Sequence, residues 1–508
     1  DPDNGRYKLY TRYRKEIAGD DIGAFLTFNT TEGEQIEVQM GVSFVSIENA
    51  RLNLDTEQSG KNFSQVLADA RMRWNEDLSC ILVKGGTEEQ KTVFYTALYH
   101  TLIHPNILQD VNGQYPAMES NEILTTDGDR YTVFSLWDTY RNVHQLLTLV
   151  YPERQLQMVR SMLDMYREHG WLPKWELYGR ETLTMEGDPS IPVIVDTWLK
   201  GLRDFDIDLA YEAMYKSATL SGVENLLRPD NDDYMSLGYV PLREQYDNSV
   251  SHALEYYIAD YSLSLLADAL GKKADARLFY NRSLGYRHYY SKEFGTFRPI
   301  LPDGQFYSPF NPRQGENFEP NPGFHEGCAW NYTFYVPHDV KGLARLIGGQ
   351  KPFIEKLQRV FDDGLYDPAN EPDIAYAHLF SYFKGEEWRT QKETQRLLQK
   401  YFKNAPDGIP GNDDTGTMST WAIFNMIGFY PDCPGAPYYT LTTPVFDKVV
   451  VRLDPDTWGS DKLVIETERP SAESLYIREM ELGGKKLSRY RISHEELVKG
   501  GTLKFILR

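Results

Sequence analysis

Residues 93–102, Val-Phe-Tyr-Thr-Ala-Leu-Tyr-His-Thr-Leu, carry their apolar side chains at the spacing of an α-helix. Phe94, Ala97 and Leu98 recur at intervals of three and four residues, which places them on one buried face. Segments of the same kind follow as far as residue 428, without an exact repeat of sequence, at 138–150, 153–168, 191–203, 209–218, 249–270, 272–291, 352–362, 374–383, 388–402 and 416–428. About eleven consecutive helices joined by loops form a bundle, a solenoid or a double-layered α/α toroid. Several loops are long, aromatic and acidic, which favours the toroid because its loops build a pocket.

Strand patterns flank this helical region on both sides. Residues 36–44 alternate apolar and polar side chains as a half-buried strand does, and residues 24–28 predict a preceding strand. Two or three strands do not form a stable domain, so these either pack on the rest of the chain or belong to a larger β-domain. Strand-like segments return after Pro431, at 438–442, 445–453, 462–466, 475–482 and 502–507. The predicted order is β, then all-α, then β.

The composition excludes several functional classes. The chain of 508 residues has 54 Lys and Arg against 74 Asp and Glu, and this net charge of −20 repels nucleic acid and acidic membrane surfaces. No apolar run approaches the roughly 18 residues that span a bilayer. The three cysteines form no close pair, and no convincing zinc, phosphate-loop, dinucleotide or serine-hydrolase motif is present. We therefore expect no nucleic-acid partner, no membrane span and no zinc chemistry.

Two loop segments between predicted helices combine carboxylates with glycine. One is Gly323-Phe-His-Glu-Gly-Cys-Ala-Trp-Asn-Tyr332, and the other is Pro410-Gly-Asn-Asp-Asp-Thr-Gly416. Glycines permit tight turns that aim an acidic side chain into a cavity. Two simpler interpretations remain open: Asp413 and Asp414 cap the helix that follows, and Glu326 pairs with a nearby Arg or Lys.

The leading chemical use of two acids from separate loops of an all-α barrel is cleavage of a glycosidic bond. One carboxylic acid protonates the departing oxygen, and one carboxylate activates water or attacks the sugar. We expect Glu326 to be desolvated beside Trp330 and Tyr332 and so kept protonated, while an aspartate at a solvated helix start stays ionised.

Six ordered blocks of sequence extend this interpretation across nearly the whole chain. They are 41–50 (Gly-Val-Ser-Phe-Val-Ser-Ile-Glu-Asn-Ala), 136–141 (Leu-Trp-Asp-Thr-Tyr-Arg), 172–176 (Leu-Pro-Lys-Trp-Glu), 325–339 (His-Glu-Gly through Val-Pro-His-Asp), 370–372 (Asn-Glu-Pro) and 411–431 (Gly-Asn-Asp-Asp through Gly-Phe-Tyr-Pro). In these blocks the chain resembles the bacterial exo-acting α-mannosidases of glycoside hydrolase family 92, which depend on calcium and invert configuration.

The resemblance implies roles for individual residues. It makes Glu326 the general acid and Asp414 the general base, with Asp413 as the alternative base or an orienting group. The segments that line the family's pocket match residues that we take as substrate-binding: Trp137, Asp138, Arg141, Trp175, Glu176, His325 and Asn412. The competing interpretations are core packing for Trp137 and an i,i+3 ion pair between Asp138 and Arg141. Glu255 lies on an otherwise aromatic helix, and either the barrel interior or the surface suits it.

Calcium is the cofactor that the resemblance implies, and it prefers hard oxygen ligands. Asn370 and Glu371 fit chemically, and the resemblance places their loop near the metal. Members that cut α-1,2 linkages often carry His-Glu shortly before Asn-Glu-Pro, whereas this chain has Pro368-Ala369 there, which argues against an α-1,2 preference.

The resemblance also implies an architecture: final strands of an N-terminal β-sandwich over 1–57, a linker over 58–85, an α/α toroid of the six-hairpin type as catalytic domain over 86–431, and a small C-terminal β-element over 432–508. The chain is expected to lack most of the sandwich and therefore to be weakly active or inactive alone. The expected partners are mannose-containing glycans, met in the periplasm, at the cell surface or outside the cell. Two other functions stay open: a carbohydrate-binding protein without turnover, and an α/α-barrel glycosidase of different sugar specificity.

Overall fold

The computed structural model describes residues 23, 25–243, 248–315 and 319–508. Residues 1–40 and 41–508 form two separate compact units. The described residues of the first unit contain one turn, closed by a hydrogen bond from the Glu34 N–H to the Thr31 carbonyl (3.1 Å), and neither a helix nor a strand.

The prediction of strands at 24–28 and 36–44 is wrong for the residues that the structure describes. Residues 25–28 and 36–44 are irregular, and their apolar side chains, such as Phe25, Val38 and Val42, are exposed. An alternating pattern forms a strand only when a second strand pairs with its backbone and a core covers one face. Residues 1–22 and 24 of the predicted sandwich strands lie outside the described residues.

Two helices open the second unit, where the sequence predicts the last sandwich residues and a linker. Helix α1 covers Ile47–Gln58, and its N-cap Ser46 accepts a hydrogen bond from the Asn49 N–H. Helix α2 covers Phe63–Leu78 and begins with a reciprocal capping box between Asn62 and Gln65. None of the residues of α2 is buried. Local capping therefore defines these helices where no apolar face predicts them.

The central region alternates largely buried helices with half-exposed ones, as an α/α toroid requires. The buried set is α5 (Val143–Val150), α7 (Ser190–Leu199), α10 (Ser249–Ala269), α12 (Ala329–Thr333), η7 (Tyr376–Tyr382) and α16 (Thr417–Ile427). The half-exposed set is α3 (Glu88–His100), α6 (Pro152–His169), α8 (Ile207–Thr219), α11 (Lys273–Ser283), α14 (Gln350–Asp362) and α15 (Glu387–Tyr401).

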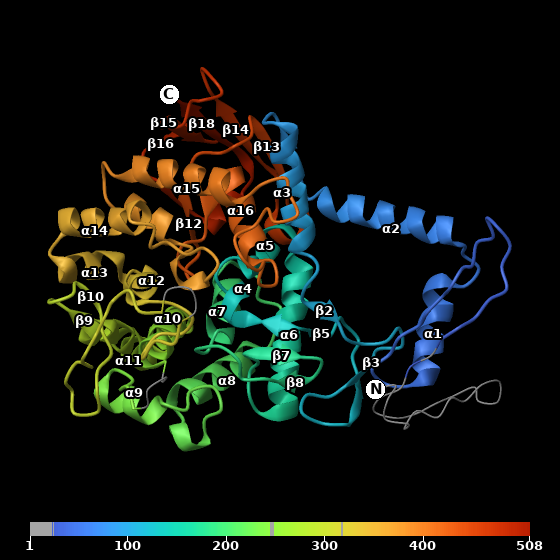
Figure 1. Cartoon of the computed structure of the whole chain (residues 1–508), viewed down its shortest axis with the longest axis horizontal. Helices are drawn as coiled ribbons and strands as arrows, with labels where there is room; N and C mark the ends of the chain where they lie inside the picture. The colour runs from blue at the N-terminus through green and yellow to red at the C-terminus, as the bar shows by residue number, and fades with distance from the viewer. Residues whose placement is uncertain (1–22, 24, 244–247, 316–318) are drawn as a thin grey trace. The chain divides into compact units, whose positions relative to one another are not determined.

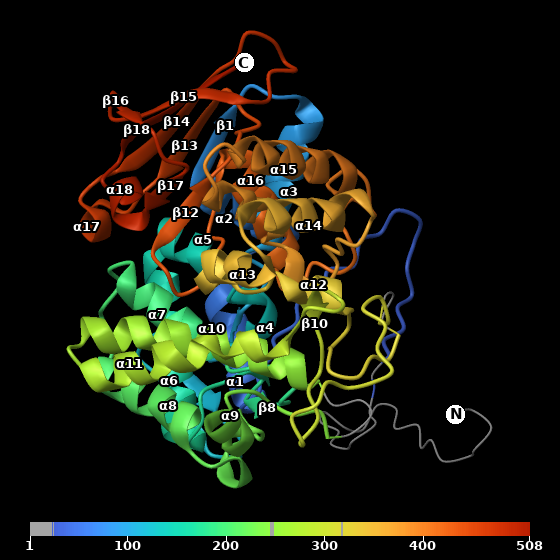
Figure 2. The ribbon, with the colours of Figure 1, turned by 90° about the vertical axis from the view of Figure 1, so that its left-hand side faces the viewer.

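Helices of the two sets pack against each other in chain order. Helix α5 packs on α6, α7 on α10, and α10 on α11, while α3 at the start of the region packs on α16 at its end. This last contact closes the ring, and the predicted toroid is confirmed (Figures 1 and 2). Shorter helices fill the connections, namely α4 (Leu136–Thr139), α9 (Asn231–Leu237), α13 (Val340–Ile347), η2 (Gly222–Glu224), η3 (Leu284–Tyr289), η5 (Pro337–Asp339) and η6 (Glu371–Asp373). The periodicity covers η3 within the predicted segment 272–291 and part of α4 within 138–150, and it does not predict the others.

The C-terminal region forms a sheet that also takes in a strand from the predicted linker. Its order is β1-β13-β14-β18-β15-β16, made of Ile81–Lys84, Lys448–Arg452, Lys462–Glu468, Gly501–Leu507, Ile477–Leu482 and Lys485–Leu487. Strands β14 and β18 are parallel, and the other neighbours are antiparallel. The edge strand β1 pairs with β13 in the register Ile81↔Val451. The sheet lies beside α15 and α16 in both views (Figures 1 and 2).

Small sheets complete the fold. A three-stranded sheet of β11 (Phe429–Tyr430), β12 (Tyr438–Leu441) and β17 (Arg491–Ser493) lies at the end of the toroid, and the short helices α17 (Pro455–Trp458) and α18 (His494–Val498) flank the C-terminal strands. The loops of the toroid contain β2 (Asn106–Ile107) with β5 (Tyr131–Thr132), β3 (Gln114–Pro116) with β4 (Ile123–Thr125), β9 (Tyr290–Ser291) with β10 (Thr296–Phe297), and β6 (Phe134–Ser135) with β7 (Trp175–Leu177) and β8 (Arg180–Glu181). All three cysteines are buried, and none of them forms a disulfide. No helix among the described residues combines the length and apolar character needed to cross a membrane.

Candidate active site

Four carboxylic acids from separate parts of the toroid lie within electrostatic reach of Asp138 or Glu371. Asp138 comes from α4, Glu326 from the loop before α12, Glu371 from η6 and Asp414 from the loop before α16. Burial raises the pKa of Asp138 to about 8, with added repulsion from Asp414 and Glu326, while Ser135 and Arg141 oppose the shift. Burial likewise raises the pKa of Glu371 well above its ordinary value, again with repulsion from Asp138 and Asp414. The site thus concentrates negative charge in a region of poor solvation, where it retains protons or attracts a cation.

The two predicted catalytic acids both occupy left-handed backbone. Glu326 has φ +48°, Asp414 has φ +47° and the following Thr415 has φ +52°. Side chains with a Cβ avoid this region, and each such residue costs on the order of 1–3 kcal/mol unless the surroundings hold it there. Strain of this kind concentrates at functional sites, so its occurrence at both acids marks these two loops.

Close backbone contacts hold the loops of the site together. A Cβ added at Gly411 (φ +69°) would lie 2.7 Å from the Cβ of Ala369, so only glycine allows the loop before α16 to approach the Asn370 loop this closely. The Asn370 Nδ2 donates a hydrogen bond to the Glu326 carbonyl (2.8 Å). The sequence blocks at 326, 370 and 414 are therefore neighbours in space.

Asp413 and Asp414 have different partners, although they are adjacent in sequence. The Asp413 Oδ1 accepts a hydrogen bond from the Ser419 N–H in the first turn of α16 (2.8 Å), and its Oδ2 lies 3.6 Å from the His100 Nδ1. Burial raises the pKa of Asp413, while the Ser419 hydrogen bonds oppose this. Asp413 thus caps helix α16, a role that the sequence allowed for both residues. Asp414 instead interacts electrostatically with Asp138 and Glu371.

Arg141 lies beneath the site and pairs with Glu255, not with Asp138. Its Nη2 is 2.8 Å from the Glu255 Oε1, and its guanidinium lies 4.8 Å from the ring centroid of Trp137. The Tyr140 hydroxyl donates to the other Glu255 oxygen (2.6 Å). Glu255 is 3% exposed, so the barrel interior, and not the surface, is its position. Trp137 is buried at 1% exposure, packed between this pair and the His325 ring, whose centroid is 6.2 Å away.

The other residues predicted to bind substrate differ in whether contacts within the protein already occupy their side chains. Both oxygens of Glu176 accept hydrogen bonds from the protein, from the Thr132 hydroxyl (2.8 Å), the Val133 N–H (3.0 Å) and the Gly179 N–H (2.5 Å). Glu176 therefore holds a turn of the β6-β7-β8 sheet and has little capacity left for a sugar. Trp175 beside it is half-buried, and Asn412 is exposed.

The environment expected for Glu326 differs from the one observed. The Glu326 side chain is 35% exposed, so Trp330 and Tyr332 do not desolvate it. Trp330 points elsewhere and packs under the Lys356 ammonium, 4.6 Å from its ring centroid. The Tyr332 hydroxyl donates to the His325 carbonyl (2.6 Å). Helix α12 starts between Glu326 and Trp330, so these two side chains point in different directions although they are close in sequence.

Several polar residues next to the site are not predicted from the sequence. Glu186 contacts His325, with 2.9 Å between its Oε1 and the His325 Nδ1, and it also contacts His252. Lys174 is buried at 4% exposure, and burial lowers its pKa. Lys174 belongs to a matched block, which is the one signal that could have singled it out. Glu186 and His252 lie in no motif, and only the fold brings them to His325.

The residues predicted to hold calcium have the right chemistry. The Asn370 Oδ1 and Glu371 Oε1 are buried and have no hydrogen-bond partner among the described residues. Asp138 adds carboxylate oxygens that repel those of Glu371. Within the described ranges, no three or more His, Cys, Asp and Glu side chains cluster as a metal site. The candidate donors are thus amide and carboxylate oxygens, a set that suits Ca²⁺ and not a nitrogen- or sulfur-preferring metal.

An α/α toroid whose loops carry acids, with buried amide and carboxylate oxygens beside them, suits the catalytic domain of a glycoside hydrolase. Residues 49–508 match the glycosyl hydrolase family 92 catalytic domain, and the chain belongs to this family. The assignment made from the six sequence blocks is confirmed.

Solved structures and a curated relative agree with this assignment. The family GH92 α-mannosidase BT3965 from Bacteroides thetaiotaomicron superposes with a TM-score of 0.84 at 33% identity, covering 92% of this chain and 61% of that one. The family GH92 inverting mannosidase BT2199 from the same organism gives 0.84 at 30% identity, covering 92% and 65%. An uncharacterized secreted glycosidase of Arthroderma benhamiae is 28% identical over 528 residues, covering 96% of this chain and 62% of the relative. The chain therefore spans somewhat under two thirds of the length of each of these relatives.

Proposed function

We propose that this chain carries the catalytic centre of an inverting exo-α-mannosidase that releases terminal α-linked mannose from glycans. The observation that carries the proposal is that Glu326 and Asp414, each on left-handed backbone, both raise the pKa of the buried Asp138 by electrostatic repulsion. BT3965 is described as an α-mannosidase and has been solved with mannoimidazole, and BT2199 is described as an inverting mannosidase. Both acids are present, which disfavours a binding protein without turnover.

Each acid has one proton to move. Glu326, which is partly exposed, gives its proton to the glycosidic oxygen as the bond from that oxygen to the anomeric carbon breaks. Asp414 takes a proton from a water molecule as the water oxygen bonds to the same carbon from the opposite face. The product then emerges as the β-anomer, with the leaving alcohol neutral.

The surrounding residues orient the sugar and the acids. Trp175, which is half-buried, supplies a ring face, and Trp137, buried at 1% exposure and packed on Arg141, supports the site from within the core. Asn370 anchors the Glu326 backbone, and Asp413 anchors the loop of Asp414 on α16. Glu176 maintains the turn that carries Trp175.

Calcium fits this centre as a cofactor. Asn370 and Glu371 would hold it through their unpartnered oxygens, with Asp138 adjacent. When bound, the cation supplies positive charge that binds sugar hydroxyls and balances the acid cluster. An exported location, in the periplasm, at the cell surface or outside the cell, suits a glycan substrate, and the fungal relative is described as secreted.

Proton NMR of the reaction tests this function. The first anomer released from an aryl α-mannoside should be β, and the first appearance of the α-anomer would refute inversion. Glu326→Gln should abolish cleavage of substrates with poor leaving groups and spare an activated aryl mannoside more, because a good leaving group needs little protonation. An equal loss of activity on both substrates would contradict the assignment of Glu326 as the general acid.

A further inference from the structure

Glu186 is a buried carboxylate that the proposed chemistry leaves without a role. It is 2% exposed and lies in the loop between β8 and α7. Its Oε1 is 2.9 Å from the His325 Nδ1 and accepts a hydrogen bond from the Asn248 Nδ2 (2.8 Å). Its other oxygen contacts the His252 Nε2. A carboxylate with this degree of burial is rarely retained without such partners.

The loop that carries Glu186 is held in a strained conformation. Leu183 and Met185 have φ of +55° and +65°, values that side chains with a Cβ avoid. Gly187 has φ +83°, and a Cβ there would lie 2.4 Å from the Cβ of Glu255. The loop is thus pressed against the Arg141–Glu255 pair, and it can keep this shape only if it is anchored.

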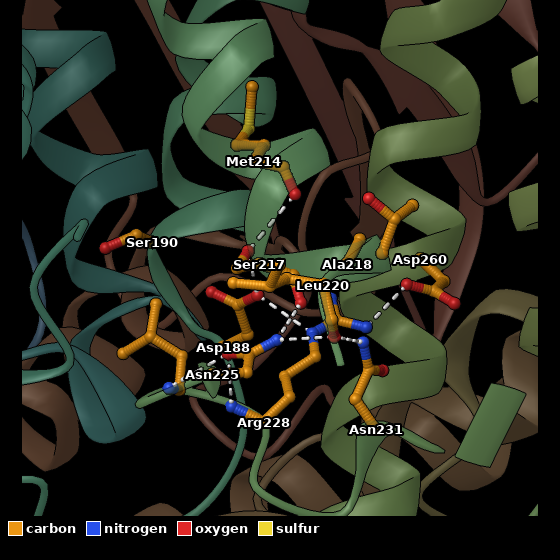
Figure 3. Close-up of polar contacts among 12 residues, drawn as sticks. Asp188, Ser190, Met214, Ser217, Ala218, Leu220, Asn225, Arg228, Asn231 and Asp260 are labelled. Carbon is orange, nitrogen blue, oxygen red and sulfur yellow. Dashed lines mark hydrogen bonds and ion pairs between the residues drawn. The ribbon is translucent and has the colours of Figure 1, made fainter. Parts of the chain in front are cut away.

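Asp188 provides the anchor on the opposite side of the loop. Its Oδ2 accepts hydrogen bonds from the fully buried Arg228 Nε (2.9 Å) and the Ser217 hydroxyl (2.7 Å). Arg228 also binds Asp260 with its Nη1 (2.8 Å), which ties the loop to α10 (Figure 3). Asp188 therefore points away from the acid cluster and into this buried network, while Glu186, two residues earlier, contacts His325.

The contacts of His325 indicate which ring nitrogen carries a proton. Two atoms lie 2.9 Å from the His325 Nδ1, the Glu186 Oε1 and the Asn248 Nδ2. The Asn248 amide donates to the same Glu186 oxygen (2.8 Å), and a carboxylate oxygen is repelled by a lone pair and attracted by an N–H, so we take Nδ1 as the donor. Burial lowers the pKa of His325, and the neutral ring then has its lone pair on Nε2. That atom lies 3.7 Å from the Glu326 Oε1 and 3.1 Å from the Met185 Sδ.

We propose that Glu186 is a positioning residue that fixes the His325 ring and, through it, the side chain of the general acid Glu326. The Glu326 carbonyl is already held by Asn370 and its φ is set, so the side-chain torsions are the remaining freedom. A ring locked beside the carboxyl restricts those torsions. Misplacement of a reacting group by about 1 Å costs roughly 100-fold in rate. The catalytic consequence rests on the proposed function, whereas the His325 tautomer does not.

¹⁵N NMR of histidine-labelled protein tests the tautomer directly. The His325 signal, assigned by its loss in His325→Gln, should show the Nδ1–H tautomer in the wild-type chain and should move toward Nε2–H in Glu186→Ala. Asp188→Asn is the matched control, because it weakens the anchor of the same loop without removing the His325 partner, and its spectrum should keep Nδ1–H. A wild-type Nε2–H tautomer, with Asn248 donating to Nδ1, would overturn the proposal.

A leaving-group comparison tests the catalytic consequence. Glu186→Ala should lower kcat about 100-fold on an unactivated α-mannoside and less than 5-fold on a dinitrophenyl α-mannoside, with KM nearly unchanged. Glu186→Gln, which keeps an acceptor oxygen, should recover most of the loss. A merely structural role would lower both substrates by the same factor, as expected for Asp188→Asn, and that result for Glu186→Ala would overturn the proposal. The chain is expected to be weakly active or inactive alone, so if the wild-type chain cleaves neither substrate, the ¹⁵N NMR result alone decides the assignment of Glu186.

Discussion

Separate substitutions of Asp413 and Asp414 test which of the two is the general base and which caps helix α16. Asp413→Ala removes the acceptor for the Ser419 N–H at the start of α16. Loss of a helix cap costs about 1 kcal/mol. Unfolding entropy of about 2 cal/mol/K per residue, over the 41–508 unit, gives roughly 1 kcal/mol per degree, so Tm should fall by about 1 °C. Activity should fall by less than about 10-fold, because the carboxyl that faces the acid cluster remains.

Asp414→Asn should show the opposite pattern. Removing a general base costs about 100- to 10,000-fold in kcat, which corresponds to roughly 3–5 kcal/mol. The negative charge of Asp414 also raises the pKa of Asp138 and Glu371. Removal of this charge relieves repulsion, so the Tm of Asp414→Asn should stay level or rise. The assays are hydrolysis of an activated aryl α-mannoside and thermal unfolding of both variants. A loss of activity in Asp413→Ala as large as that in Asp414→Asn would refute the assignment.

Two further predictions concern the cation and the buried Glu255. Activity should disappear in EDTA and return with calcium, and Glu371→Gln should raise the calcium concentration needed at least 10-fold; full activity after thorough chelation would rule the cofactor out. Burial raises the pKa of Glu255 from 4.5 to about 7. Because the folded state holds this proton more tightly, the associated stability is complete below pH 4.5 and is lost as pH rises to about 7, a change of about 3 kcal/mol. Glu255→Gln should lack this pH-dependent loss, which denaturant unfolding at pH 4.5 and 7.5 measures; a constant difference from wild type would contradict it.

Sequence periodicity predicted the helices of the toroid correctly, whereas the N-terminal strands that it predicted are absent from the described residues. A helix satisfies its backbone within one segment, so spacing such as that of Phe94, Ala97 and Leu98 is informative by itself. A strand needs a partner, and the alternating residues 36–44 stay irregular and exposed in the structure. For the same reason the linker strand β1 went unpredicted, because its partner β13 lies more than 350 residues further along the chain.

The sequence alone determined the helical architecture, the family and the two acidic loops. Each of these is encoded locally, in apolar spacing or in short blocks such as Gly411-Asn412-Asp413-Asp414. Adjacent residues, however, receive different environments: Asp413 caps α16 while Asp414 joins the acid cluster, and Trp330 turns away from Glu326.

Only the tertiary structure decided the surroundings of the acids. It pairs Arg141 with Glu255 across more than 100 residues, and it brings Glu186 to His325 across a similar separation. It also leaves the Asn370 and Glu371 oxygens buried without partners. Burial and electrostatic repulsion depend on which groups meet in space, and the packing of distant helices and loops, which no local pattern specifies, sets those meetings.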